Sequence, residues 1–272
     1  MKKTLLFSSL ICLILLIVGC NTENLKEVNK KEDISEDEQG LGWKHDNPAA
    51  PTAGEWKAID FPDGRNYSLE PPPANDSDIT KKDLEELRQL AENRTEEDIK
   101  IINRWAGEIT GPNTRWTAVT EEILKKYNLA PPEAARVNHI VSGAIYTASV
   151  AAFHEKYLYL RPRPTHLDPN LKLIENFTVP AHPSYPSAHA TTGWAACTVL
   201  SYIFPDEKDT FIAMAIESEL SRKLAGVHFD SDNIAGRKLG KQISEDIIEG
   251  LKDDHAPLYF KEHQQSTGET GH

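Results

Sequence analysis

Residues 131–160 read PPEAARVNHIVSGAIYTASVAAFHEKYLYL, and this stretch decides the fold. Two prolines open it, which is typical of the first turn of a helix. Apolar residues then recur at helical spacing and form a broad face: Val137, Ile140, Val141, Ala144, Ile145, Ala148 and Ala152. The pattern predicts a long helix from Pro131 to about Leu160, with one side packed into a core. It contains no alternation typical of a half-buried strand.

The sequence on either side of this helix predicts more helices and no strand pair. Downstream, an extended connection through residues 161–186 is enforced by Pro162, Pro164, Pro180, Pro183 and Pro186. Upstream, Thr80 with Asp83 and Thr95 with Asp98 fit capping boxes. Further helices are expected at about residues 117–127, 187–203, 208–224 and 232–251. We therefore predict an all-α fold, a single helical bundle domain over residues 79–252, followed by a polar tail at residues 253–272.

The N-terminus resembles a bacterial lipoprotein signal in residues 1–20. Two lysines precede an apolar run that ends in Ile-Val-Gly-Cys20. Cys20 would carry the lipid, which predicts a protein anchored to a membrane of the bacterial cell envelope and facing the periplasm or exterior. A plain signal peptide or a short membrane anchor is the alternative. Residues 21–78 are acidic and proline-rich, and we interpret them as a partly disordered tether.

Composition limits the classes of partner. The chain has 272 residues and a net charge of −12, with no basic run. This charge argues against a nucleic acid, but not against an anionic substrate, because a pocket can oppose the global sign. Once Cys12 and Cys20 are assigned to the signal, Cys197 stands alone, so no intrachain disulfide is expected. Its apolar neighbours indicate a small core residue. The oligomeric state is left open.

Three short segments concentrate residues suited to binding an oxyanion. Lys156, Arg163 and Arg222 supply positive charge, and guanidinium groups fork onto phosphate oxygens. Ser187, Ala188 and His189 stand at the expected start of a helix, where free amides and the helix dipole favour an anion. His228 and Asp232 are four residues apart, so the carboxylate could hold the imidazole in one tautomer. Together they predict an anion cradle with two imidazoles.

Each of these residues also has an ordinary structural interpretation. Lys156 and Arg163 could solvate a helix end, and Ser187 could serve only as an N-cap. His189 and His228 could be partly buried core histidines. Arg222 could pair with Glu217 or Glu219 on its own helix, and Asp232 could be a helix cap. These interpretations predict no shared spacing among the three segments, whereas the spacing follows a known signature.

The three segments resemble the signature of the type 2 phosphatidic acid phosphatase and vanadium-dependent haloperoxidase superfamily. That signature is Lys-x₆-Arg-Pro, then Pro-Ser-Gly-His, then Ser-Arg-x₅-His-x₃-Asp. The chain has Lys156-x₆-Arg163-Pro164, Pro186-Ser187-Ala188-His189 and Ser221-Arg222-x₅-His228-x₃-Asp232, in the same order. Ala188 replaces the usual glycine, and an alanine still offers its amide unless the position needs a positive φ.

The resemblance implies a role for each matched residue. Oxygens of the anion would be held by Lys156, Arg163, Arg222, Ser187 and the amide of Ala188. His228 would attack phosphorus as the nucleophile, Asp232 would orient it, and His189 would act as general acid and base. No metal is required. The chain lacks spanning helices after residue 20, so it resembles the soluble branch of the superfamily.

Two activities remain open within the resemblance. A phosphatase would hydrolyse phosphate monoesters through a phosphohistidine and need no cofactor. A vanadium-dependent haloperoxidase would bind vanadate through His228 and oxidise halide with hydrogen peroxide. His182, in a segment resembling bromoperoxidases, could belong to a halide site, serve as an acid-base group, or be structural. We favour the phosphatase, because Leu160–Pro164 and Thr192–Ala195 resemble bacterial acid phosphatases. A third possibility is a surface lipoprotein that binds an oxyanion without catalysis.

Overall fold

The computed structural model describes residues 40–56, 60–106 and 112–261. Its helices are α1 (Asp78–Glu92), α2 (Glu96–Ala106), α3 (Pro112–Lys126), α4 (Pro131–Tyr159), α5 (Pro164–Leu167), α6 (Ala188–Ile203), α7 (Lys208–Leu224) and α8 (Asp230–Leu251). No strand occurs in these ranges. The predicted all-α class is therefore confirmed. The predicted signal with Cys20 and the tail beyond residue 261 lie outside the described residues.

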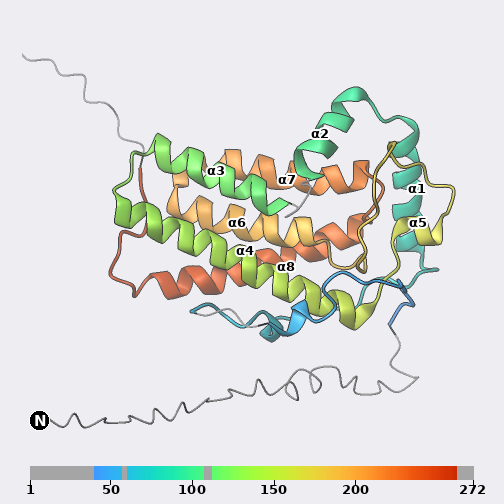
Figure 1. Ribbon diagram of the computed structural model, residues 1–272, viewed down its shortest axis with the longest axis horizontal. Helices are drawn as coiled ribbons and strands as arrows, with labels where there is room; N and C mark the ends of the chain where they lie inside the picture. Colours follow the sequence, from blue (N-terminus) through green and yellow to red (C-terminus); the bar gives the residue numbers. More distant parts are fainter. Residues whose placement is uncertain (1–39, 57–59, 107–111, 262–272) are drawn as a thin grey trace, which may run out of the picture. The chain divides into compact units, whose positions relative to one another are not determined.

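Helix α6 is the centre of the bundle. It packs against α4, α7 and α8, which run alongside it in Figure 1. Most of its side chains are buried, so it shows no polar face. Two glycines of α8 allow the closest approach: a Cβ at Gly236 would lie 2.6 Å from the Ser187 carbonyl oxygen, and one at Gly240 would lie 2.3 Å from that of Thr191. The first turn of α6 thereby packs directly against the second and third turns of α8.

Helix α4 ends where the predicted anion cradle begins. Its C-cap, Leu160, has a left-handed conformation with φ of 48°. The carbonyl of Leu160 accepts a hydrogen bond from the amide of Trp43 at 2.7 Å, and that of Tyr159 accepts one from Leu41 at 2.7 Å. These bonds satisfy carbonyls that a helix end leaves without an intrahelical partner. The chain can then turn sharply from Lys156 in the last turn to Arg163.

The predicted tether of residues 21–78 needs a correction. Residues 40–56 and 60–77 form a strap against α4, with the short 3₁₀ helices η4 (Ala53–Glu55) and η5 (Gly64–Asn66). Trp43, Tyr67 and Leu69 are buried there. The buried Glu155 carboxylate accepts a hydrogen bond from the Leu69 amide at 3.1 Å. The strap escaped prediction because its few apolar residues follow no helical or strand period.

Smaller differences concern the ends of elements. Ser77, rather than Thr80, caps α1, since its hydroxyl accepts from the Thr80 amide at 3.2 Å. The Thr95–Asp98 capping box is confirmed, with reciprocal bonds of 2.8 and 3.2 Å. The connection 161–186 contains the one-turn helix α5, which the prolines did not predict. The predicted polar tail also begins later, because the Phe260 amide donates to the Ile203 carbonyl at 2.8 Å.

Candidate active site

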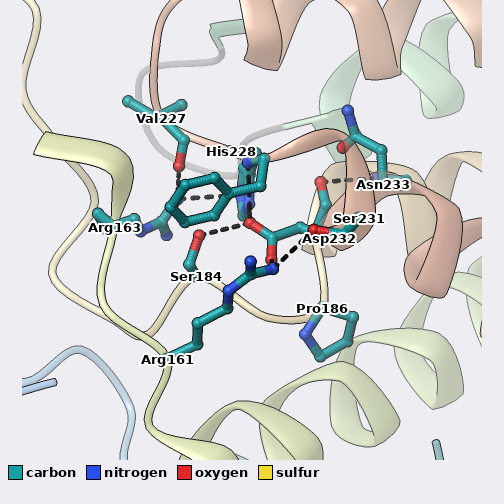
Figure 2. Close-up of polar contacts among 12 residues, drawn as sticks. Arg161, Arg163, Ser184, Pro186, Val227, His228, Ser231, Asp232 and Asn233 are labelled. Atoms are coloured by element: carbon teal, nitrogen blue, oxygen red, sulfur yellow. Dashed lines mark hydrogen bonds and ion pairs between the residues drawn. The ribbon is translucent and has the colours of Figure 1, made fainter. Parts of the chain in front are cut away.

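The residues of the predicted cradle come from five places that meet at one end of the bundle. Lys156 lies in the last turn of α4, and Arg163 follows in the connection. Ser187, Ala188 and His189 begin α6, while Arg222 lies in the last turn of α7. His228 and Asp232 lie in the α7–α8 turn and the first turn of α8. Figure 2 shows the contacts around Asp232 and His228.

His228 is held in a single neutral tautomer. Its Nε2 lies 2.9 Å from Arg163 Nη1, and its Nδ1 lies 3.0 Å from Asp232 Oδ2. A guanidinium can only donate hydrogen bonds, so Nε2 accepts and the ring proton sits on Nδ1. Burial and the charge of Arg163 lower the pKa of His228 well below its usual value. The ring therefore keeps a lone pair on Nε2, directed at a cation.

Asp232 is the fixed anion behind this imidazole. Its side chain is fully buried, which opposes ionisation, but the charge of Arg161 and the bond from His228 hold its pKa well below the usual range. Oδ1 accepts from Arg161 Nη1 at 2.7 Å, and Oδ2 accepts from Ser184 Oγ at 2.5 Å. Oδ2 also accepts from the Phe229 amide at 3.1 Å, so Asp232 caps α8 as well as orienting His228.

Arg163 contacts two imidazoles, that of His182 in the connection before α6 and that of His228 in the α7–α8 turn. Besides His228, its guanidinium donates to the Val227 carbonyl at 2.8 Å and to the His182 carbonyl at 3.1 Å. Its Nη2 lies 3.0 Å from His182 Nδ1. Burial lowers the pKa of Arg163 to about 10, although Asp232 partly compensates. The guanidinium of Arg163 thus lies between His182 and His228 and contacts both rings.

Arg222 reaches the site from α7. Its Nε donates to Ser221 Oγ at 2.9 Å and its Nη2 to the Ile102 carbonyl at 3.2 Å. Burial, together with the charge of Arg163, lowers its pKa to about 9. The glutamates expected as its alternative partners are engaged elsewhere: Glu217 pairs with Arg104, and Glu219 pairs with Arg237. A structural ion pair on its own helix therefore does not explain Arg222.

Lys156 points its ammonium group into the loop before α6. Nζ donates to the carbonyls of Pro183 at 2.8 Å, Ser184 at 3.0 Å and Pro186 at 2.5 Å. Burial and the charge of Arg163 lower its pKa well below the usual value. These three bonds use its three donors, so Lys156 shapes the loop that presents Ser187 and adds positive charge to the site.

The start of α6 supplies the remaining predicted groups. Ser187 Oγ accepts from the Ala190 amide at 3.4 Å as an N-cap, and the Ser187 amide donates to the Asp232 carbonyl at 3.0 Å. Ala188 is not among the described residues with positive φ, so it replaces glycine without strain. His189 Nε2 lies 2.9 Å from the Trp105 carbonyl and must donate to it. Burial and Arg222 lower the pKa of His189 well below the usual value.

The sequence analysis assigned no role to two residues of this network. Arg161 and Ser184 both bond the Asp232 carboxylate and are fully buried. Arg161 stands two positions before Arg163 in the stretch Arg-Pro-Arg-Pro. In an extended segment, residues two positions apart point to the same side. The position of Arg161 relative to Arg163 was therefore the one sequence feature that could have placed Arg161 near the site. Ser184 had no such feature.

The electrostatics of the site call for an anion. Among the described residues, Asp232 forms an ion pair with Arg161, whereas no carboxylate pairs with Lys156, Arg163 or Arg222. All three of these cations are buried. Buried charge without a partner is costly, and the cost is offset when a negatively charged ligand binds. The arrangement fits a tetrahedral oxyanion near Nε2 of His228.

Comparisons with characterised proteins agree with this geometry. The profile of the PAP2 superfamily matches residues 137–243. Over 114 residues the chain is 29% identical to the non-specific acid phosphatase of Providencia stuartii, covering 41% of this chain and 46% of that protein. Over 108 residues it is 32% identical to the decaprenylphosphoryl-5-phosphoribose phosphatase of Mycolicibacterium smegmatis, covering 40% and 57%. The chain thus spans about half the length of these two relatives.

Similarity to solved structures concerns the fold. A bacterial vanadium-dependent iodoperoxidase superposes with a TM-score of 0.65 at 21% identity, over 75% of this chain and 58% of that one. An apo-type bacterial vanadium-dependent chloroperoxidase gives 0.62 at 15% identity, over 76% and 56%. The matched residues 137–243 contain every cradle residue from Lys156 to Asp232. Residues 137–243 of this chain therefore form a region of the PAP2 superfamily type.

Proposed function

We propose that the protein is a metal-independent phosphatase that hydrolyses phosphate monoesters through a phosphohistidine. One observation carries the proposal: the neutral imidazole of His228 keeps its lone pair on Nε2, where Arg163 donates to it, and none of the three buried cations of the cradle has a carboxylate partner among the described residues. The relatives named as phosphatases support the same chemistry. The substrate class is a small phosphorylated molecule, and no nucleic acid is involved.

In the first half-reaction, the phosphate dianion replaces the Nε2 contact of His228 with Arg163. Arg163, Arg222 and the amides at the start of α6 hold its non-bridging oxygens, where charge develops in the transition state. Nε2 forms a bond to phosphorus while the bond to the ester oxygen breaks. Asp232 stabilises the positive charge that His228 acquires.

His189 handles the proton in both half-reactions. Its Nε2 is bonded to the Trp105 carbonyl, so Nδ1 is the nitrogen left to exchange a proton. The negative charge of the bound ester counteracts Arg222 and favours protonation of His189, which then gives its proton to the leaving alcohol. In the second half-reaction, neutral His189 takes a proton from water as the water oxygen attacks phosphorus and releases His228.

The test is hydrolysis of p-nitrophenyl phosphate in the presence of EDTA. We expect turnover that vanadate inhibits competitively and that His228→Asn reduces by at least about 10³-fold. His139→Asn is the matched control, because His139 lies on the surface near the start of α4 and should leave the rate unchanged. Absence of turnover over a broad panel of phosphate esters, with correctly folded protein, would contradict the proposal.

A vanadium-dependent haloperoxidase is the second candidate, favoured by one observation. His182 lies beside the cradle through Arg163, where it could act on peroxide or halide. The cationic donor set and Nε2 of His228 fit vanadate as well as phosphate, and bound vanadate would supply peroxide activation. Bromide and iodide oxidation should be assayed in vanadate-loaded protein, with His182→Ala beside it. A lack of oxidation of both halides would exclude this activity.

We also propose that the protein is anchored to the bacterial cell envelope through lipid on Cys20. The support is the signal-like sequence of residues 1–20. Within the described part of the chain, none of the helices has the length and hydrophobicity to cross a bilayer. Full-length protein should label with palmitate and sediment with membranes, whereas Cys20→Ala should not label. Equal labelling of the two proteins would contradict the anchor.

A further inference from the structure

Arg161 is a buried arginine that the oxyanion cradle does not use. Its side chain is fully buried, and Nη1 lies 2.7 Å from Asp232 Oδ1 and 2.9 Å from Ser231 Oγ. Nη2 donates to Thr80 Oγ1 at 3.1 Å. The guanidinium carbon lies 4.2 Å from the centre of the Phe229 ring. Arg161 is thus fixed from α1, α8 and the α7–α8 turn.

The two oxygens of Asp232 have different partners. Oδ1 accepts from Arg161, whereas Oδ2 accepts from Ser184, His228 and the Phe229 amide (Figure 2). A carboxylate held at both oxygens cannot rotate without breaking an ion pair. The arrangement leaves Oδ2 as the oxygen that faces Nδ1 of the imidazole. The two arginines of Arg-Pro-Arg-Pro therefore have separate tasks.

We propose that Arg161 is a positioning residue that keeps Asp232 ionised and turned toward His228, and so maintains the tautomer with a lone pair on Nε2. Arg163 binds the anion, whereas Arg161 holds the Asp232 carboxylate that contacts His228. The catalytic meaning of this role rests on the proposed phosphatase function. The effect on the state of His228 does not depend on it, so the two can be tested separately.

Removing Arg161 changes the charge balance around His228 in a definite direction. The charged or titratable groups that influence His228 and its neighbouring imidazoles are Lys156, Arg163, His182, His189, Arg222 and Asp232. Asp232 is the anion of this set, and Arg161 neutralises much of its charge. Without Arg161, Asp232 would stabilise the imidazolium more strongly, so His228 should protonate at higher pH.

The experiment is an NMR titration of ¹⁵N-histidine-labelled protein, with kinetics on the same samples. Wild type should show His228 neutral, with the proton on Nδ1, across the neutral range. In Arg161→Gln, the protonation midpoint of His228 should rise by about one pH unit or more. The acid limb of kcat/KM should move upward with it. At neutral pH, kcat should fall about 10- to 100-fold, as expected when the partner behind a functional histidine is lost.

Three further variants make the result interpretable. Arg161→Lys keeps the charge and should keep the wild-type midpoint, even if it loses kcat. Thr80→Val removes the Nη2 bond of Arg161, together with the bonds of the Thr80 hydroxyl to Ala74 and Ser77, but leaves the ion pair of Arg161 with Asp232 in place. Arg136→Gln removes an arginine–aspartate pair near the other end of α4. Neither should move the midpoint. If Arg161→Gln lowers stability but leaves the tautomer and midpoint of His228 unchanged, the positioning role is overturned. If no variant or wild type hydrolyses esters, the proposed function fails while the titration still decides the role of Arg161.

Discussion

At the scale of single residues, hydrogen-bond direction assigns the chemistry of the site. Arginine can only donate, so its contact with Nε2 of His228 makes that nitrogen an acceptor. A carbonyl can only accept, so the contact of His189 Nε2 with Trp105 makes that nitrogen a donor. Two histidines in one site are therefore held in opposite tautomers. In the proposed mechanism, this difference distinguishes the nucleophile His228 from the acid-base group His189.

Asp232→Asn should preserve the geometry of the site but reduce its activity. The amide can occupy the same space, but it can donate to Nδ1 and so favour the tautomer with the proton on Nε2. That tautomer has no lone pair directed at phosphorus. We expect kcat to fall by about 10³- to 10⁴-fold, as when a carboxylate behind a catalytic histidine is neutralised. Stopped-flow trapping of phosphohistidine should show slower formation. Unchanged trapping rates would rule out the orienting role of Asp232.

At the scale of elements, the contact between α6 and α8 positions the cradle. The carbonyls of Ser187 and Thr191 approach α8 at two glycines one turn apart, Gly236 and Gly240. Only residues without a side chain permit this distance. The amide of Ser187 also donates to the Asp232 carbonyl, which joins the first turns of the two helices. The start of α6 and the carboxylate of α8 are therefore placed by backbone contact.

Gly240→Ala should weaken this contact. The new Cβ would lie 2.3 Å from the Thr191 carbonyl oxygen, so the helices must separate. Overpacking of this kind costs about 1–3 kcal/mol of unfolding free energy. Gly250→Ala is the control in the same helix, because its Cβ meets no atom within 4 Å. That variant should gain about 0.5–1 kcal/mol from helix propensity. Urea denaturation compares them, and equal stability of the two variants would contradict close packing at Gly240.

At the scale of the whole molecule, the bundle stores unpaired positive charge at one end. Three buried cations lie there beside three histidines, and burial together with these positive charges lowers the pKa values of the histidines. At this end, the strap of residues 40–56 and 60–77 donates backbone hydrogen bonds to the C-terminus of α4. Stability in the absence of an anion should therefore depend on pH.

The ligand-free protein should lose stability as pH falls from about 7 to 5. His182, His189 and His228 resist protonation when folded, whereas an unfolded chain protonates them below about pH 6.5. Protons then favour unfolding. Phosphate should oppose this loss, adding about 2.7 kcal/mol at a concentration of 100 times Kd. Thermal melting at both pH values, with phosphate or with chloride of matched ionic strength, measures the effect. Equal melting temperatures in the two salts would argue against an oxyanion site.

The sequence alone determined the all-α class, most helix positions and the set of residues that gather at the site. Helical periodicity and prolines are local signals, and the spacing from Lys156 to Asp232 is a linear pattern. The strap could not be predicted, because its burial depends on surfaces presented by α4. The same holds for Arg161 and Ser184, whose partner Asp232 lies 71 and 48 residues away in the chain. The motif spacing assigned Arg163 to the cradle, but only folding decided that Arg161 contacts the Asp232 carboxylate, because that ion pair joins segments distant in sequence.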